Sequence, residues 1–264
     1  MGGVKSQLPL ETSVVNGVTV ENRKLLTNRV ITGSAASEGT TLTQIERKNY
    51  APGGSAVNDP KKTDIQRLLD LRQLGAVMHS SPLLLSNGGK ITYNAITKKL
   101  ESSNREDYVL FGTTQGLLHV VKADDYTLTN GGGKEIFAFV PHEMIKNQSP
   151  AFRTPEETTG GTAALFYGID APWTAYTEYV PKSDGTLTVG TGKTITVDGS
   201  STQLKGKQLV YGGLRMGGRS YYALDLKDMN DPKLKFHIDP DSHLSGPLSY
   251  MGQSWSKPNI ALVS

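Results

Sequence analysis

The 264-residue sequence contains no cysteine at all. This absence excludes disulfide bonds, cysteine-ligated zinc and a thiol nucleophile. It does not assign a compartment, because a secreted bacterial protein of this size can lack disulfides as easily as a cytosolic one. A chain of this length can bury a substantial hydrophobic core without disulfides or metals.

Long apolar runs and a strong charge of one sign are also missing. No run of about 18 apolar residues occurs, so no transmembrane helix is expected, and the N-terminus lacks the basic and apolar regions of a signal peptide. The net charge is only +3, with lysine and arginine spread along the chain, unlike the basic face of a duplex DNA reader. We expect a cytoplasmic protein or a piece of a longer precursor. The apolar run 257–264, expected to be a strand, favours a piece.

One pattern occurs twice, about a hundred positions apart, in residues 108–137 and 208–236. In each copy, two strand-like runs flank a glycine-bearing turn, an acidic turn follows, and a Lys-x-x-Phe sequence opens a third strand. A repeated antiparallel unit of this kind predicts blades of a β-propeller. The 29 glycines fit a protein rich in turns. We therefore expect an all-β fold.

We expect a single, partial propeller domain over residues 1–264, with N-terminal strands and a loop in 1–60 and recognisable blades in 61–264. A short helix is expected near 63–74. Thr63 is a good N-cap residue with Gln66 three positions later, a capping-box arrangement. The apolar residues that follow share one helical face; they are Ile65, Leu68 and Leu69.

Two further segments are expected to be irregular or exposed. Residues 142–163 are predicted to be a polar loop. Residues 185–197 alternate threonine with apolar residues, which indicates a surface hairpin with one face in water, and its turn is predicted at 191–193. The sequence GTGKT at 190–194 does not make a phosphate-binding loop, because Leu187 stands where that motif needs glycine.

Oxygen-bearing side chains cluster in the turn of the second copy, at Asp225, Asp228, Asn230 and Asp231. Hard cations such as Ca²⁺ favour such a cluster on a loop. The segment lacks the D-x-D-x-D-G register and the distal glutamate, and Asp and Asn also populate turns by bonding their own backbone. An Asx-rich turn is the first interpretation. The metal-site alternative has Asp225, Asp228 and Asp231 as its candidate ligands.

The remaining polar residues predict no catalytic centre, so no catalytic or cofactor-binding residue is assigned. The histidines include no i,i+4 pair on a helix; they are His79, His119, His142, His237 and His243. His119 is expected to be structural, bonding a neighbouring loop. His79 is followed by two serines, but no G-x-S-x-G elbow is present. The strand-borne aromatics are expected to pack in the core and between blades; they are Trp173, Tyr176, Tyr179, Tyr221, Tyr222 and Trp255.

Five segments, read in order, resemble motifs of the propeller of the PilY/PilC family of type IV pilus-associated adhesins and biogenesis factors. They are RQLGAVMHSSP at 72–82, FGTTQGLLH at 111–119, GKEIFAFVP at 133–141, YGGLRMGGRSYYALD at 211–225 and GQSWSKP at 252–258. Five collinear motifs are more specific than any single one. The chain departs from the family pattern at Ala76, where the family has aspartate, and at Thr114-Gln115, where it has Asn-Asp.

The resemblance implies quinoprotein-like blades and a non-enzymatic protein, secreted and displayed at the outer membrane or pilus tip. There it would support pilus biogenesis, twitching motility, DNA uptake and adhesion. The implied partners are pilins or minor pilins and a host or abiotic surface, with weak contact to DNA as a further expectation. The resemblance places calcium in the full-length protein and on no residue of this chain. The alternative is a quinone-dependent propeller dehydrogenase, although those enzymes commonly carry a vicinal cysteine pair.

Overall fold

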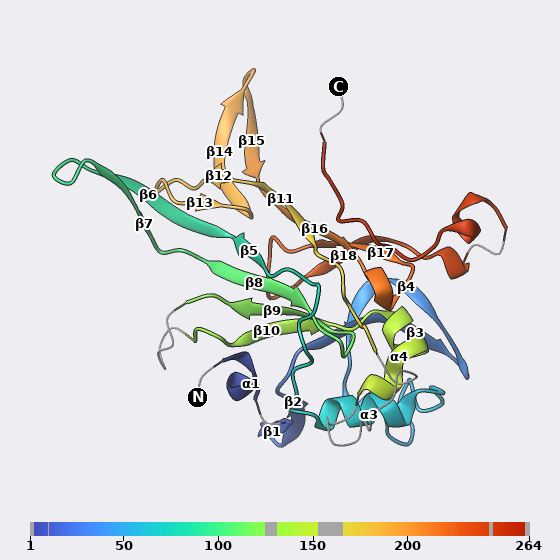
Figure 1. Cartoon of the computed structure of the whole chain (residues 1–264). Coiled ribbons are helices and arrows are strands. Elements are labelled where there is room, and N and C mark those ends of the chain that lie inside the picture. The colour runs from blue at the N-terminus through green and yellow to red at the C-terminus, as the bar shows by residue number, and fades with distance from the viewer. Residues whose placement is uncertain (1–2, 10, 125–130, 153–165, 243–244, 262–264) are drawn as a thin grey trace.

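The computed structural model describes residues 3–9, 11–124, 131–152, 166–242 and 245–261 (Figure 1). These residues form mainly β-strands with a few short helices, which confirms the all-β expectation. The described residues show two four-stranded antiparallel units and no closed propeller.

The first unit contains the first copy of the repeated pattern. It consists of β5 (Leu83–Ser86), β8 (Asp107–Gly112), β9 (Leu118–Lys122) and β10 (Glu135–Phe139), each antiparallel to the next. Between β8 and β9 the chain turns at Gly116, whose φ of 83° favours glycine. The three strands predicted from the pattern are confirmed.

The second unit repeats this arrangement with the second copy. It consists of β11 (Thr174–Glu178), β16 (Lys207–Gly213), β17 (Tyr221–Asp225) and β18 (Lys233–Ile238), again antiparallel in order. The repeat in the sequence is thus a repeat in topology. Each unit also has an insertion at the same place, between its first and second strands.

The two insertions pair with each other. The first is the hairpin of β6 (Gly88–Asn94) and β7 (Lys99–Ser103), and the second begins with β12 (Val180–Pro181) and β13 (Leu187–Thr188). They form one sheet in the order β12-β13-β6-β7, and the β6–β7 hairpin projects from the body of the protein (Figure 1).

The second insertion ends in a separate hairpin of β14 (Thr191–Val197) and β15 (Ser200–Lys205). The hairpin prediction is confirmed, but the turn predicted at 191–193 is wrong. These residues begin β14, and the chain reverses at Asp198 and Gly199, whose φ angles are 49° and 76°. An Asp-Gly pair in this conformation is a preferred two-residue hairpin turn.

N-terminal strands extend the first unit. A hairpin of β1 (Thr12–Val15) and β2 (Val18–Glu21) is followed by β3 (Leu25–Thr32) and β4 (Ala35–Gln44). Strand β3 pairs in parallel with β10, so the sheet runs β4-β3-β10-β9-β8-β5. Strand β5 lies at its edge, which fits the proline that precedes Leu83.

The longest helix is shorter than expected and begins earlier. Helix α3 spans Lys62–Asp70, with no side-chain cap at its N-terminus, so the predicted Thr63 cap is wrong. The start is held from outside the helix, because Asp59 accepts hydrogen bonds from the backbone N–H groups of Lys61 and Lys62. The helix ends where Leu71 turns to extended backbone. The predicted apolar face is buried as expected.

The other α-helices among the described residues are α1 (Val4–Gln7), α2 (Arg47–Tyr50) and α4 (His142–Gln148). Helix α4 corrects the predicted polar loop, whose residues 153–163 lie outside the described part of the chain. Residues 257–261 are not in a strand, so the strand predicted there is wrong over those residues, and Pro258 cannot donate to a sheet. In the described residues, no helix is long and apolar enough to span a membrane.

Strand β10 separates two hydrophobic cores. Phe137 and Phe139 point into the core shared with the second unit, which contains Trp173 and Tyr222. Ala138 lies between them in sequence and packs into the core beneath α3. Alternate residues of a strand point to opposite faces, so β10 is covered on both sides. The shared core fixes the two units against each other.

Candidate functional site

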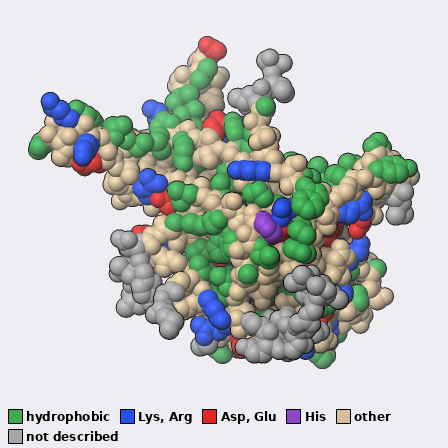
Figure 2. All heavy atoms as spheres, in the orientation of Figure 1, with side chains coloured by type: hydrophobic (Ala, Val, Ile, Leu, Met, Phe, Trp, Pro, Cys, Tyr) green, Lys and Arg blue, Asp and Glu red, His purple; other side chains and the backbone are tan. Residues whose placement is uncertain are grey.

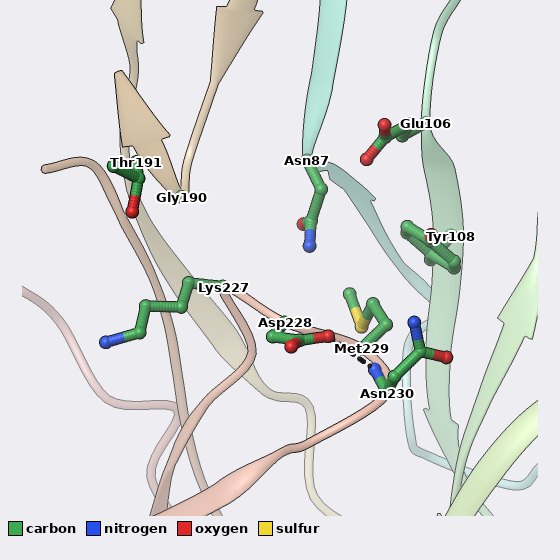
Figure 3. A pocket seen from close by; sticks show the side chains of 9 residues that line it. All are labelled: Asn87, Glu106, Tyr108, Gly190, Thr191, Lys227, Asp228, Met229 and Asn230. Carbon is green, nitrogen blue, oxygen red and sulfur yellow. Dashed lines mark hydrogen bonds between the residues drawn. The ribbon is translucent and has the colours of Figure 1, made fainter. Parts of the chain in front are cut away.

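A polar pocket of about 380 Å³ lies where the two units meet. Three separate segments surround it in Figure 3: the start of the first insertion with the adjoining part of β8, the start of β14, and the turn between β17 and β18. Its lining residues are Asn87, Glu106, Tyr108, Gly190, Thr191, Lys227, Asp228, Met229 and Asn230.

Asn87 holds the pocket walls together. Its side chain is buried, its Nδ2 donates to Leu226 O at 2.8 Å, and its Oδ1 accepts from Gln208 Nε2 at 3.1 Å. Its backbone N–H donates to Glu106 O and its carbonyl accepts from Val189 N–H. Three of its four polar groups therefore join the first unit to the second unit and its insertion, and the backbone N–H bonds within the first unit.

Most of the side chains that line the pocket are charged, amide or hydroxyl groups. Burial, and then the negative charges of Glu106 and Asp228, raise the pKa of the Tyr108 hydroxyl, so this hydroxyl keeps its proton near neutral pH. Lys227 contributes a cation that is also paired with Asp225 at 3.4 Å. This arrangement can hold a polar ligand by hydrogen bonds, and it contains no nucleophile held by a base.

The candidate metal ligands lie at or near this pocket but are used in turns. Asp225 Oδ1 accepts from Lys227 N–H at 3.1 Å, and Asp228 Oδ1 accepts from Asn230 N–H at 2.8 Å. Asp231 Oδ1 pairs with Lys233 Nζ at 2.6 Å. Only Asp228 lines the pocket. Within the described residues, no three carboxylate or histidine side chains converge as a set of metal ligands.

A second cluster joins segments that are far apart in sequence. His79 Nδ1 lies 2.9 Å from Asp170 Oδ1, and Arg215 Nη1 donates to Asp170 Oδ2 at 2.8 Å. Arg215 in turn lies over the ring of Trp255, 5.0 Å from its centroid. Asp170 is buried whereas His79 is half-exposed. This cluster brings together three of the five motifs, and Asp170, which none of them contains, was missed by sequence reasoning.

The serines beside His79 do not form a catalytic pair with it. Ser80 is buried, and its Oγ accepts from Gly112 N–H at 2.8 Å.

The two departures from the family pattern contact each other: Ala76 N–H donates to the Thr114 hydroxyl, and Thr114 N–H donates to Ala76 O. These hydrogen bonds hold the motif segments 72–82 and 111–119 together.

His119 belongs to a buried ionic group. Its Nδ1 lies 2.7 Å from Glu135 Oε2, and Arg23 donates to both oxygens of the same carboxylate. Burial alone would raise the pKa of Glu135, but the hydrogen bond and charge of His119, followed by Arg23, lower it to about 2. The structural role is as expected, although the main partner is a strand residue and not a loop.

Another buried group ties the N-terminal strands to α4. Arg29 donates from Nε and Nη2 to the two oxygens of Asp59, and its Nη1 lies 3.0 Å from His142 Nδ1. Burial and then the charge of Arg29 lower the pKa of His142 to about 4. On the adjoining strand, Glu38 pairs with His237 at 2.9 Å. The Glu38–His237 pair joins β4 to β18 of the second unit. His243 lies outside the described residues.

The aromatic residues divide between core and surface. Trp173 and Tyr222 are buried in the shared core, as expected. Tyr179 and Trp255 are exposed, which corrects their assignment to the core. Trp255 packs on the Arg215 guanidinium and lies outside the strands.

No protein-family model matches the sequence. The type IV pilus biogenesis factor PilY1 of Pseudomonas aeruginosa is 26% identical over 197 residues, which cover 71% of this chain and 14% of that protein. The PilY1 homolog of Xylella fastidiosa is 25% identical over 202 residues, which cover 72% of this chain and 13% of that protein. The chain therefore spans a small part of the relatives that it matches.

A crystal structure of the Pseudomonas aeruginosa PilY1 C-terminal domain is 24% identical to this chain. The match covers 63% of this chain and 24% of that one, with a TM-score of 0.33, which does not establish a shared overall fold. The two sequence relatives confirm the resemblance indicated by the five motifs: this chain is PilY1-like.

Proposed function

We propose that this protein acts in type IV pilus biogenesis as a non-enzymatic binding and assembly protein. The observation that carries the proposal is the similarity to two type IV pilus biogenesis factors over more than two thirds of this chain. The site geometry is compatible with it. The buried charges hold strands and loops together, and the pocket between the units offers hydrogen-bonding groups for a polar ligand.

The finer parts of the proposal follow the same resemblance. The two units act as blades of a propeller. The protein is secreted and reaches the outer membrane or the pilus tip, where it contacts pilins or minor pilins. Through the pili it supports twitching motility, DNA uptake, and adhesion to a host or abiotic surface. Any calcium in the full-length protein binds at residues other than Asp225, Asp228 and Asp231.

Deletion of the gene in its own bacterium tests the proposal. We expect fewer surface pili in electron micrographs and smaller twitching zones, with both restored by the wild-type gene in trans. A tagged copy should be found in the sheared pilus fraction or be accessible to protease on intact cells. Unchanged piliation, twitching, DNA uptake and adherence in the deletion strain would contradict the proposal.

A further inference from the structure

The β6–β7 hairpin exposes an apolar face. Ile91 and Tyr93 are two positions apart on β6 and therefore point to the same side, and Leu100 of β7 lies directly opposite Tyr93. Their exposed fractions are 59%, 63% and 75%, and Ile96 in the turn is 93% exposed. Figure 2 shows hydrophobic and basic side chains together on this projection. Contiguous exposed apolar side chains of this kind mark interaction sites.

The hairpin, residues 88–103, is held in shape before any partner binds; we call it the arm. Asn94 Oδ1 accepts hydrogen bonds from the backbone N–H groups of Ile96 and Thr97, which fixes the turn. Asn94 Nδ2 donates to Glu101 Oε1 at 2.7 Å across the two strands. Because the turn is already ordered, a partner that binds the arm loses little affinity to its ordering.

The arm carries an excess of positive charge. It contains three lysines and one glutamate, a net charge of +2. Glu101 already accepts a hydrogen bond, whereas neither Lys98 nor Lys99 is in an ion pair within the described residues. These two lysines directly precede Leu100 in the sequence, next to the free edge of the arm. The charge is complementary to carboxylates on a partner.

Strand β7 is the last strand of its sheet. The order β12-β13-β6-β7 leaves one side of β7 without a neighbouring strand in the described residues, and all five of its residues are exposed. An edge of this kind has backbone N–H and C=O groups free to pair with another chain, and extended peptides bind such edges as an added strand.

We propose that the arm binds an extended segment of another protein in which apolar residues alternate with Asp or Glu. The segment adds as a strand to the free edge of β7. Its apolar side chains pack beside Leu100 and extend the apolar face that Ile91, Tyr93 and Leu100 begin, and its carboxylates pair with Lys98 and Lys99. The proposal does not depend on a role in pilus biogenesis.

The chemistry of the arm favours a protein over a lipid surface. The other face of the arm, on the side away from Tyr93, carries polar side chains, which are Lys90, Thr92, Asn94, Lys99 and Glu101. Insertion of the hairpin into a bilayer would bury this polar face together with the apolar one, and buried charges without partners are costly. A strand added at the edge packs its apolar side chains beside Leu100 on the apolar face and leaves the polar face in water.

A fluorescently labelled peptide of alternating Glu and Val serves as the probe, with a peptide of alternating Lys and Val as its comparison. Anisotropy titrations with the full chain should show the acidic peptide binding at least about tenfold more tightly. Its affinity should fall as NaCl rises from about 50 mM to about 300 mM, because salt screens exposed charges. N-methylation of alternate peptide nitrogens should abolish binding, since it removes the N–H groups that pair with an edge strand.

Two variants locate the binding. Tyr93→Ser with Leu100→Ser should weaken binding of the acidic peptide at least about tenfold, and Lys98→Glu with Lys99→Glu should reverse the preference between the peptides. The matched control is Val14→Ser with Val18→Ser in the β1–β2 hairpin, whose valines are similarly exposed. It should bind as the wild type does. Circular dichroism and thermal unfolding of each variant show that the fold is retained.

Four results would overturn the proposal. The first is equal binding of the two peptides, and the second is binding unaffected by the arm variants. The third is arm-dependent binding to mixed phosphatidylcholine and phosphatidylglycerol vesicles without peptide binding, which would assign the arm to a lipid surface. The fourth is concentration-dependent dimerisation abolished by the Tyr93 and Leu100 substitutions, which would make a second copy of this chain the occupant.

Discussion

The indole ring of Trp173 packs directly on Gly212, so closely that a Cβ at Gly212 would overlap the ring. The same relationship occurs in the first unit. Gly112 stands at the equivalent position of the repeated pattern, and a Cβ there would overlap Ile169. Neither glycine has a left-handed backbone conformation. Each is needed because the absence of a side chain leaves room for the residue that packs on it. The connection that leads from the first unit to the second therefore crosses both units at their glycines.

Gly212→Ala should lower the free energy of unfolding by about 2 kcal/mol, because the added methyl group overpacks the core at Trp173. In a chain of this size that is a fall of about 4–8 °C in Tm. Gly252→Ala is the control, since a Cβ there meets no atom within 4 Å. Thermal unfolding followed by circular dichroism measures both. An unchanged Tm for Gly212→Ala would show that the close packing on Trp173 is incorrect.

Glu135→Gln should destabilise the fold by about 3 kcal/mol, because it leaves the buried charges of Arg23 and His119 without their carboxylate. Glu178→Gln is the comparison: Glu178 pairs with Lys207 at 2.8 Å but is exposed, so its loss should leave the unfolding midpoint unchanged. Urea unfolding at neutral pH measures both variants. Equal effects would contradict a buried, structural role for the Glu135 group.

Stability should fall as the pH decreases from about 6.5 to about 4 because of His142. Burial and Arg29 lower the pKa of His142 to about 4 in the folded protein, whereas the unfolded chain takes up the proton near its ordinary pKa. Acid therefore favours the unfolded state over this range. His142→Asn keeps an acceptor for Arg29 and removes the titration, so its stability should fall less. Urea unfolding over this pH range measures the stability of both proteins. An equal loss of stability in the wild type and in His142→Asn would contradict the role given to His142.

His237 should have the opposite effect. The hydrogen bond to Glu38 raises its pKa in the folded protein, so its contribution is fully present below the unfolded pKa of about 6.5 and is lost as the pH rises through the raised value. His237→Gln should therefore destabilise the protein more at about pH 6 than at about pH 9. The test compares the free energy of unfolding of the variant with that of the wild type at each pH. Equal differences at the two pH values would contradict a stabilising pair between His237 and Glu38.

Asn87→Ala should lower the free energy of unfolding by about 2 kcal/mol and loosen the pocket between the units. The substitution leaves Leu226 O and Gln208 Nε2 without their buried partner, and such groups are costly to bury unpaired. Asn94→Ala in the arm provides the comparison, because Asn94 makes its hydrogen bonds at an exposed turn. The same loss of stability in both variants would contradict the role given to Asn87.

Calcium at about 1 mM should leave the Tm of this chain unchanged, because Asp225, Asp228 and Asp231 are used in turns and in pairs with lysine. Differential scanning fluorimetry with calcium and with a chelator measures the effect. A rise in Tm with calcium that Asp228→Asn removes would instead show that the turn is a metal site.

The repeated strands could be predicted because their signal is local. Alternating apolar residues in β8, β9 and β17, with glycine-bearing turns between strands, fix the strands and their antiparallel pairing within each unit. The helix boundaries were predicted less well. Helix α3 begins at Lys62 and not at Thr63, because Asp59, outside the predicted capping box, holds its first turn.

The candidate site could be predicted only in part. Asp228 was a candidate metal ligand in the sequence and lines the pocket, but the sequence predicted neither the pocket nor a role for Asn87 and Tyr108, which come from the first unit. Asp170 has no signal in its neighbourhood either, since its partners are His79 and Arg215. Residues that are far apart in sequence become a site only when their strands pack.

The sequence by itself determined the strands of the two repeated units and the resemblance to pilus biogenesis factors, because alternation, turn glycines and ordered motifs are properties of neighbouring residues. The tertiary structure decided the rest. It placed Trp173 on Gly212, paired one insertion with the other, enclosed the pocket around Asn87, and left the apolar face of the arm in water. Each of these depends on which surfaces are buried against each other, and that is settled by packing between distant segments.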